Sequence, residues 1–583
     1  MRLKSYFIKL INSLNSLNSL NSLNLLNLLN SLNLLNSLNS PNIYIFMKKF
    51  ILSIALLLGL GGVSQQMAAQ NLVPIPLKMQ TAANEQPLVW YNVATIDCPE
   101  SLNNEKEHLL RILKDRTGIS ELNANGTAKI TLSINPDLTD DEAYTLHLNA
   151  DGVEIAGKTA AGVFYGVMTL EQLMIDDNAS ARCLETAAID IEDAPRTHVR
   201  ELMVDPCRIF VPYERLKEIV PEMARYKLNS IHLHLVDDQA WRIEIKKYPE
   251  LIEKSTSRVG MDDMQMPISG YYTQEQMKDF VAYCAKYHVM VVPEIEMPGH
   301  EVAAIHAFPE LTCGGKQVPI RTTCGVSNEL LCPGNEFTYE FLGNVFRELA
   351  DVFPCKYIHL GGDEAGNPAL DCWTTCEKDK ALKKQLGITT TDRSENWKLQ
   401  KYMFDRVIDT LRTKYDKVPM FWYETDFKEI QEGCVTFAWR NGLTQPAINA
   451  AVENNAKIMM CPGDYCYFDY PMAQGDMPET NWGMPVRTFE TVYQFDPGWN
   501  MGAEFEENNL FGVAGTLWSE CINSPERIFY QAYPRSLILA EAGWSAKKNR
   551  SWKGFLKRSR PIMLDLQRRG ITFSMPTDYI DLQ

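Results

Sequence analysis

The sequence has little positive charge for its acidic content, and this shortage excludes one class of partner. Its 583 residues include 57 Lys and Arg against 73 Asp and Glu, for a formal net charge of −16. Such a field repels phosphate polymers, so we expect no nucleic-acid partner. Hydrophobic residues make up 45% of the chain and charged residues 22%, which is ordinary for a globular protein of two or three domains.

The apolar run near the N-terminus lacks the length that a bilayer span needs. It covers residues 50–60, follows the basic start Met47-Lys48-Lys49 and precedes the small residues Ala68-Ala69 before Gln70. This order is typical of a secretory signal peptide over residues 47–69, with no Cys near the expected cleavage point for a lipid anchor. We therefore expect an exported protein, periplasmic or secreted, without a stable membrane span.

The segment before that start has no usable periodicity. Asn-Ser-Leu and Asn-Leu-Leu repeat from Asn12 to about Asn39, and a three-residue period suits neither a helix face nor a strand face. We expect residues 1–46 to be untranslated or unstructured low-complexity sequence, with Met47 as the start. The alternative is a genuine N-terminal extension that buries the signal.

The 14 cysteines include no Cys-x-x-Cys pair, and no nearby His completes a zinc motif. Three of them, Cys313, Cys324 and Cys332, share one stretch, and Cys372 and Cys376 share another. An exported chain meets an oxidising compartment, so loop disulfides and buried free thiols both remain open. We expect no metal and no cofactor.

Residues 70–195 have the pattern of a small α+β domain. Residues 144–148 and 152–156 alternate as strands around an Asn-Ala-Asp-Gly turn, which predicts a hairpin. Apolar residues then recur at helix spacing, at Val163, Val167, Leu170 and Leu173.

Residues 196–583 change to short apolar runs that alternate with helical stretches. There are eight such runs: 202–204, 230–235, 289–293, 357–360, 419–422, 435–437, 458–460 and 513–517. This alternation predicts a (β/α)8 TIM barrel as the catalytic domain. Most runs end in acids or tryptophans, and barrel active sites lie at the strand C-termini. Acids beside flat aromatic faces suit a cleft that stacks on sugar rings and cleaves their bonds.

The segment 357–364, Tyr-Ile-His-Leu-Gly-Gly-Asp-Glu, ends in two adjacent carboxylates. Adjacent residues on an extended backbone point in different directions. Two carboxylates in one pocket repel one another, so one can hold a proton while the other stays ionised. This division of labour suits an acid catalyst and a charge stabiliser. Alone, the motif is also compatible with a surface loop or a Ca²⁺ ligand pair.

This segment, together with residues 232–251, 292–300 and Leu517-Trp-Ser-Glu520, resembles the motifs of glycoside hydrolase family 20. The resemblance runs from about residue 72 to about residue 544. It implies an exo-acting β-N-acetylhexosaminidase that removes terminal β-linked GlcNAc or GalNAc from glycans. It also implies a retaining mechanism in which the substrate's acetamido oxygen is the nucleophile and an oxazolinium ion forms, a recognised exception to the two-carboxylate rule.

The resemblance assigns the chemistry to five residues. Glu364 is similar to the general acid/base, and Asp363 to the carboxylate that orients the acetamido group and balances the oxazolinium charge. Tyr467 resembles the tyrosine that hydrogen-bonds the acetamido oxygen. Asp237 and His300 resemble the pair that supports Glu364.

The resemblance also implies the substrate contacts. Sugar-hydroxyl ligands are expected at Arg200, Asp469 and Glu520, and aromatic walls at Trp422, Trp439, Trp482 and Trp518. For Arg200, which opens the first run, the alternative is an ion pair at the bottom of the barrel. Glu296 departs from the family pattern, in which Asp is common before Met-Pro-Gly-His.

Two other functions fit parts of the sequence. His232-x-His234 on a barrel strand could present two imidazoles to a metal, with His300 and His359 as further ligands, as in a metallohydrolase. A non-catalytic glycan-binding protein could keep the same pocket. The presence of Asp363 and Glu364 argues against it, since binding alone needs no proton donor.

The signal-peptide pattern generates the first prediction. N-terminal sequencing of exported protein should begin near Gln70, because the small residues Ala68-Ala69 precede it. A mature protein that retains the Asn-Ser-Leu repeat would contradict this interpretation.

Overall fold

A computed structural model describes residues 71–81, 85–175, 182–260, 267–365, 372–425, 429–476, 483–522, 524–576 and 579. The repeat of residues 1–46 and the signal pattern of residues 47–69 lie outside these ranges, so both interpretations stay predictions. None of the helices among the described residues combines the length and the hydropathy of a membrane span.

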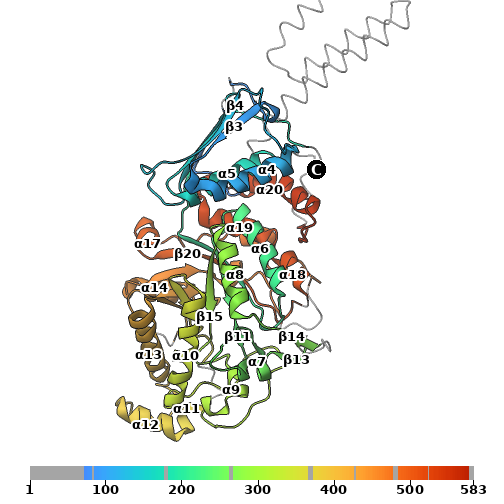
Figure 1. Cartoon of the computed structure of the whole chain (residues 1–583). Helices are drawn as coiled ribbons and strands as arrows, with labels where there is room; N and C mark the ends of the chain where they lie inside the picture. The colour runs from blue at the N-terminus through green and yellow to red at the C-terminus, as the bar shows by residue number, and fades with distance from the viewer. Residues whose placement is uncertain are drawn as a thin grey trace, which may run out of the picture. The chain divides into compact units, whose positions relative to one another are not determined.

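The domain before the barrel contains a six-stranded mixed sheet, in the order β1-β8-β5-β6-β4-β3. Its strands are β1 (Lys78–Thr81), β3 (Val93–Asp97), β4 (Ala128–Ile134), β5 (Tyr144–Asn149), β6 (Gly152–Gly157) and β8 (Ile189–Asp193). The predicted hairpin is confirmed as the antiparallel pair β5–β6. The predicted helix is α5 (Ala160–Leu173), which packs on the sheet beside α4 (Asn103–Thr117) (Figure 1).

The second part is a closed barrel of eight parallel strands, in the cyclic order β9-β10-β15-β16-β17-β18-β19-β20. The strands are β9 (Val199–Val204), β10 (Ser230–His234), β15 (Met290–Glu294), β16 (Tyr357–His359), β17 (Val418–Trp422), β18 (Val435–Ala438), β19 (Lys457–Met460) and β20 (Leu510–Leu517). All eight predicted runs are confirmed as barrel strands. Strands that are covered on both faces read as continuous apolar runs, which is why the sequence revealed them.

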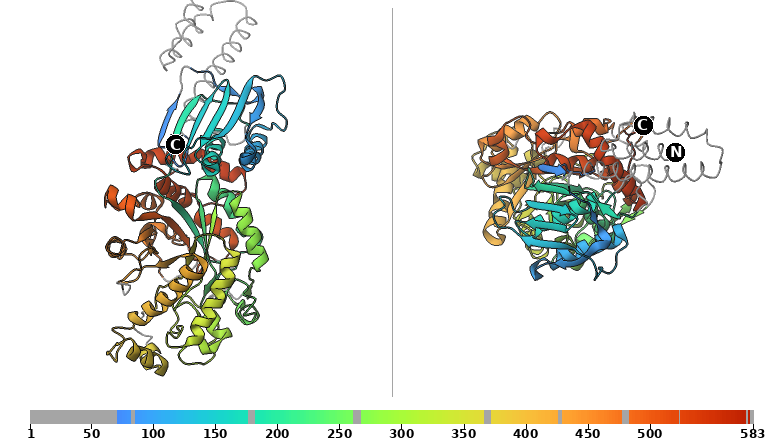
Figure 2. Two further views of the ribbon diagram at one scale, coloured as in Figure 1. Left: turned by 60° about the vertical axis from the view of Figure 1, so that its left-hand side comes forward. Right: turned by 90° about the horizontal axis from the view of Figure 1, so that it is seen from above.

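Helices surround this barrel, with the strands at the centre (Figure 2, left). The longer ones are α6 (Tyr213–Arg225), α8 (Gln274–Ala285), α10 (Glu336–Val352), α13 (Trp397–Tyr415), α14 (Thr444–Glu453), α19 (Arg535–Trp544) and α20 (Trp552–Arg568). Local sequence fixes their ends. At the start of α8, the side chain of Thr273 accepts from the amide of Gln276 and the Gln276 side chain caps Thr273 in return, a capping box.

Among the described residues, no helix lies between β17 and β18, and three short helices lie between β19 and β20. These are α15 (Gly463–Cys466), α16 (Phe489–Tyr493) and α17 (Ala503–Asn508). The irregular crossovers leave long loops at the carboxyl ends of the strands, where barrel active sites form.

Candidate active site

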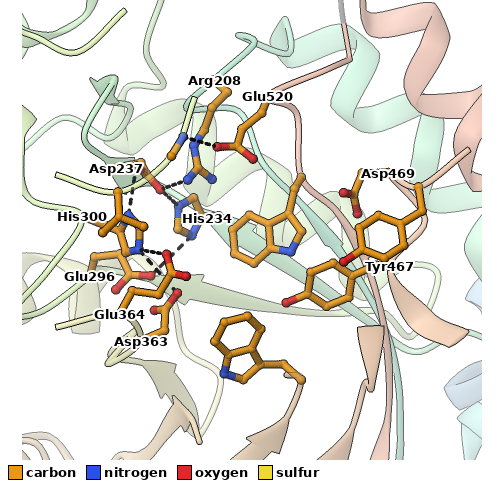
Figure 3. A pocket seen from close by; sticks show the side chains of 15 residues that line it. Arg208, His234, Asp237, Glu296, His300, Asp363, Glu364, Tyr467, Asp469 and Glu520 are labelled. Carbon is orange, nitrogen blue, oxygen red and sulfur yellow. Dashed lines mark hydrogen bonds and ion pairs between the residues drawn. The ribbon is translucent and has the colours of Figure 1, made fainter. Parts of the chain in front are cut away.

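A cavity of about 310 Å³ opens at the carboxyl ends of the barrel strands. Its volume lies at the lower end of the range of about 300–1,000 Å³ for small-molecule pockets. Nine of the predicted site residues line it: Asp237, His300, Asp363, Glu364, Trp439, Tyr467, Asp469, Trp518 and Glu520. Asp363 and Glu364 lie across the pocket from Tyr467 and Asp469 (Figure 3).

A backbone turn after β16 aims the two adjacent carboxylates. Gly361 has φ 63° and Gly362 has φ 104°, and Glu364 itself adopts φ 56°. A Cβ on Gly361 would lie 1.6 Å from a carboxylate oxygen of Glu296, so only glycine fits there. A left-handed glutamate costs energy and is uncommon, and such strain clusters at functional sites. The glycine pair in the sequence motif therefore provides the positive φ angles and the space that this turn requires.

His300 lies at the junction of the acidic groups. Its Nε2 lies 3.4 Å from Glu364 Oε2 and 3.5 Å from Asp363 Oδ2, and its Nδ1 lies 3.4 Å from Asp237 Oδ1. Burial alone would lower the pKa of His300, but the facing carboxylates of Asp237 and Asp363 raise it well above its ordinary value. A protonated imidazole in this position favours the ionised form of Asp237 behind it.

Asp237 anchors this junction to Arg208 and to the barrel interior. Its Oδ2 lies 2.7 Å from Arg208 Nη2 and 2.8 Å from His234 Nε2. Burial opposes ionisation of Asp237, but Arg208 and His300 hold its pKa well below the ordinary value. The Asp237 carboxylate is therefore a fixed anion behind His300.

Two further glutamates flank the carboxylate pair. Glu296 is fully buried, and burial together with Asp363 and Glu294 raises its pKa well above the ordinary value, which favours the uncharged form. Burial raises the pKa of Glu424 to about 7, although Arg440 opposes the shift. The same Arg440 lies 3.1 Å from Glu364 Oε1 and 3.1 Å from Glu424 Oε1.

Aromatic rings form the opposite wall. Trp439 stacks on Tyr467 at 6.4 Å between ring centroids, and Trp518 lies 6.3 Å from Tyr467. Asp469 is buried beside them, and its Oδ1 has no hydrogen-bond partner among the described residues. The Oδ1 atom of Asp363 is also buried and has no hydrogen-bond partner among the described residues. Buried acceptors without a partner need an explanation, and ligand donors supply one.

The structure corrects the expectation for Arg200. This residue lies at the amino end of β9, fully buried, and donates to the carbonyls of Lys227 (2.6 Å) and Thr197 (2.7 Å) and to the Glu142 carboxylate. Arg200 therefore forms an ion pair at the bottom of the barrel, as the alternative interpretation predicted. Residue 200 lies near the start of its strand, whereas substrates bind where barrel strands end.

The arginine that lines the pocket is Arg208, which the sequence analysis left without a role. It follows the carboxyl end of β9, contacts Asp205 at 3.1 Å and lies over the Trp518 ring at 5.3 Å. The position of Arg208 in the sequence could have identified it as a pocket residue, since Asp205-x-x-Arg208 comes directly after the first barrel strand.

Two predicted wall residues differ from the rest. Trp422 is 1% exposed and is not among the lining residues; it lies behind Trp439 and Trp518, and its indole donates to Glu294 Oε1 at 2.7 Å. Trp422 therefore supports the wall that Trp439 and Trp518 form, and its own role as a wall of the pocket stays a prediction. Trp482 lies outside the described residues, so its role stays a prediction.

The histidines of the metallohydrolase alternative face carboxylates. His232 lies 3.2 Å from Glu201 and 3.1 Å from Glu294, and His234 bridges Glu294 (2.6 Å) and Asp237 (2.8 Å). Both nitrogens of each ring are thus directed at acids within the barrel wall. These contacts give each ring a fixed place in the barrel wall, and His234 connects Glu294 to Asp237 of the pocket.

Comparison with known proteins decides the family. The model for the catalytic domain of glycosyl hydrolase family 20 matches residues 198–547, and the model for domain 2 of that family matches residues 69–194. The chain belongs to glycosyl hydrolase family 20. This relationship makes it a glycoside hydrolase of the β-hexosaminidase type, and the predicted TIM barrel with its preceding domain is the architecture of that family.

Individual relatives agree with the family. The β-hexosaminidases of Akkermansia muciniphila and Porphyromonas gingivalis are 36% and 33% identical over 72% and 75% of this chain, and the matches span 82% and 55% of those proteins. A crystal structure of a Vibrio harveyi exo-β-N-acetylglucosaminidase in complex with N-acetylglucosamine superposes with a TM-score of 0.76 at 27% identity, covering 87% of this chain and 79% of that one.

The two arginines generate a paired prediction. Arg208→Lys should raise KM about tenfold or more, because a lost hydrogen bond to a charged group costs roughly 1.5–3 kcal/mol. Arg200→Lys should leave KM unchanged and lower the unfolding temperature, because buried carbonyls lose their donor. Steady-state kinetics and thermal unfolding of both variants check this. A raised KM for Arg200→Lys alone would reverse the assignment.

Proposed function

We propose that this pocket hydrolyses terminal β-linked N-acetylhexosamine from glycans, with retention of configuration and with the substrate's acetamido oxygen as nucleophile. The observation that carries the proposal is the pairing of Asp363 and Glu364 in one small cavity opposite Tyr467. A cavity at the lower end of the usual volume range suits a single sugar ring, and therefore a chain end.

In the first step, Glu364 donates a proton to the glycosidic oxygen while the acetamido oxygen attacks the anomeric carbon. The bond from that carbon to the aglycone oxygen breaks, and the aglycone leaves with the proton. The acetamido group is already attached beside the reacting carbon, so its effective concentration is very high. Positive charge develops on the ring that forms, and the Asp363 carboxylate faces it.

In the second step, Glu364 takes a proton from water and the water oxygen attacks the anomeric carbon. The oxazoline ring opens, the acetamido group is restored, and two inversions at one carbon leave the β configuration. His300 and Asp237 position Glu364 for both transfers, since His300 lies within 3.5 Å of the two carboxylates. They are positioning residues because they act through Glu364.

The remaining polar groups suit the sugar hydroxyls. Asp469 has a buried acceptor without a described partner, and Glu520 accepts a hydrogen bond of 3.3 Å from the amide of Gly325. Arg208 supplies a donor at the same end of the pocket as Glu520 (Figure 3). The complex of the Vibrio harveyi enzyme with N-acetylglucosamine supports a terminal N-acetylglucosamine as substrate.

We further propose that the enzyme acts outside the cytoplasm, on the basis of the signal-peptide pattern of residues 47–69.

The acid generates a prediction about leaving groups. Glu364→Gln should lower turnover by roughly 10²–10⁴-fold for natural glycans, because their leaving alcohols need protonation. Activated aryl glycosides need less protonation and should lose less. Kinetics with both substrate types check this, with the exposed Glu192→Gln as the matched control. Equal losses on both would give Glu364 another role.

The nucleophile generates a second prediction. NMR should show the β anomer as the first product, and a stable thiazoline should bind far more tightly than N-acetylglucosamine, as intermediate-like molecules do. Asp363→Asn should weaken thiazoline binding, because the charge that faces the ring nitrogen is lost, whereas the exposed Asp97→Asn should not. Release of the α anomer, or a trapped glycosyl ester on an Asp or Glu, would exclude this route.

A further inference from the structure

Four sulfur and carboxylate side chains from distant parts of the sequence meet beside the barrel. The ligand-type atoms of Cys313, Cys332, Cys376 and Asp379 all lie within 4.8 Å of one another. Cys332 and Asp379 are fully buried. Cys313 donates to Asp379 Oδ2 at 3.0 Å and Cys332 to Asp379 Oδ1 at 3.3 Å. None of these four residues is among those that line the active-site cavity.

The backbone holds these side chains in place. Cys376 is the N-cap of α12 (Glu377–Gln385), and Asp379 lies three residues further on, so both project from one face of its first turn. Gly334 donates to Asp379 Oδ1 at 2.7 Å, and a Cβ on Gly334 would lie 2.5 Å from the backbone of Lys378. The chain around Cys332 therefore packs tightly against α12.

The spacing of the sulfurs suits a tetrahedral metal site. The Sγ atoms of Cys332 and Cys376 lie 3.8 Å apart. Two thiolates at a Zn–S distance of about 2.3 Å on a tetrahedral ion are separated by about 3.8 Å. A disulfide needs sulfurs about 2.0 Å apart.

We infer that Cys313, Cys332, Cys376 and Asp379 form a structural zinc site. Three thiolates and one carboxylate fill the four positions that a structural zinc takes, and no position remains for water or substrate. The helix dipole at the start of α12 favours the net negative charge of such a site. Cys372, whose thiol hydrogen-bonds Cys313, lies beside the ligand set and not in it.

The site would fasten a wall of the active-site pocket. Residues 312–335 contain no helix or strand, apart from an isolated bridge between Thr312 and Leu331. Loops longer than about 12–15 residues without secondary structure are uncommon in compact domains. Cys313 and Cys332 bracket this loop, and between them Gly325 and Val326 line the cavity. A zinc ion would therefore clamp both ends of the loop to α12.

A small apolar cluster, separate from the main core that includes Leu311 and Leu331, supports part of this region. Its buried members are Leu330, Trp373, Leu382, Ile388 and Leu399. Trp373 also donates to the Leu331 carbonyl at 3.0 Å. Satellite clusters of this size are typical under long loops, and a metal adds the folding free energy that they lack.

Elemental analysis of the purified full-length enzyme tests the inference. We expect about one zinc per chain, lost from Cys332→Ser and Cys376→Ser and weakened in Asp379→Asn. Cys372→Ser and Cys98→Ser, the latter in the first domain, should keep the full zinc content. Removal of zinc by a chelator should lower the unfolding temperature and raise KM, and added zinc should restore both.

The wild-type protein supplies a second measurement if the variants fail to fold. Cobalt(II) exchanged into the chelated enzyme should give thiolate charge-transfer bands and the intense visible bands of a tetrahedral ion. Zinc-free protein that takes up no cobalt, or whose mass shows these cysteines in disulfides, would overturn the site. Loss of zinc in Cys372→Ser with retention in Asp379→Asn would overturn the ligand set. None of these outcomes depends on the proposed catalytic mechanism.

Discussion

A chain of buried carboxylate–imidazole contacts is the constraint on which the barrel and its active site depend. Glu294 faces His232, His234 and His359 inside the barrel wall, all fully buried. Burial opposes ionisation of Glu294, but the three imidazoles hold its pKa well below the ordinary value. An unpaired charge at this depth costs several kcal/mol, so removing one partner penalises the others.

The same series of carboxylate–imidazole contacts reaches the catalytic groups through two neighbouring strands. β10 supplies His234, which joins Glu294 to Asp237, and the loop after β15 supplies His300, which joins Asp237 to Glu364. The orientation of the acid is therefore fixed by contacts that begin in the barrel core. A rigid element beneath the reacting groups is what a preorganised electrostatic site requires.

The sequence predicted the barrel because parallel strands covered on both faces are continuous apolar runs, such as residues 513–517. It predicted the roles of Asp363 and Glu364 because both lie inside a long motif, where a resemblance to a family identifies each position. For Arg200, its position at the opening of the first run was a better guide than the resemblance, because substrates bind where barrel strands end. The sequence analysis missed a role for Arg208, and it missed the group of Cys313, Cys332 and Cys376 because that group exists only after folding.

The two halves of the pocket face different physical demands. One half needs carboxylates whose positions are fixed by the buried carboxylate–imidazole contacts. The strands β10, β15 and β16 and the loops that follow them carry these residues. The other half must shape the space around the acetamido group and the hydroxyls, and part of it rests on a long loop without regular structure. Because substrate-assisted attack gains its rate from geometry, a mobile wall would weaken it. The zinc site that we infer at the base of that loop would give the second half the rigidity that the barrel core gives the first.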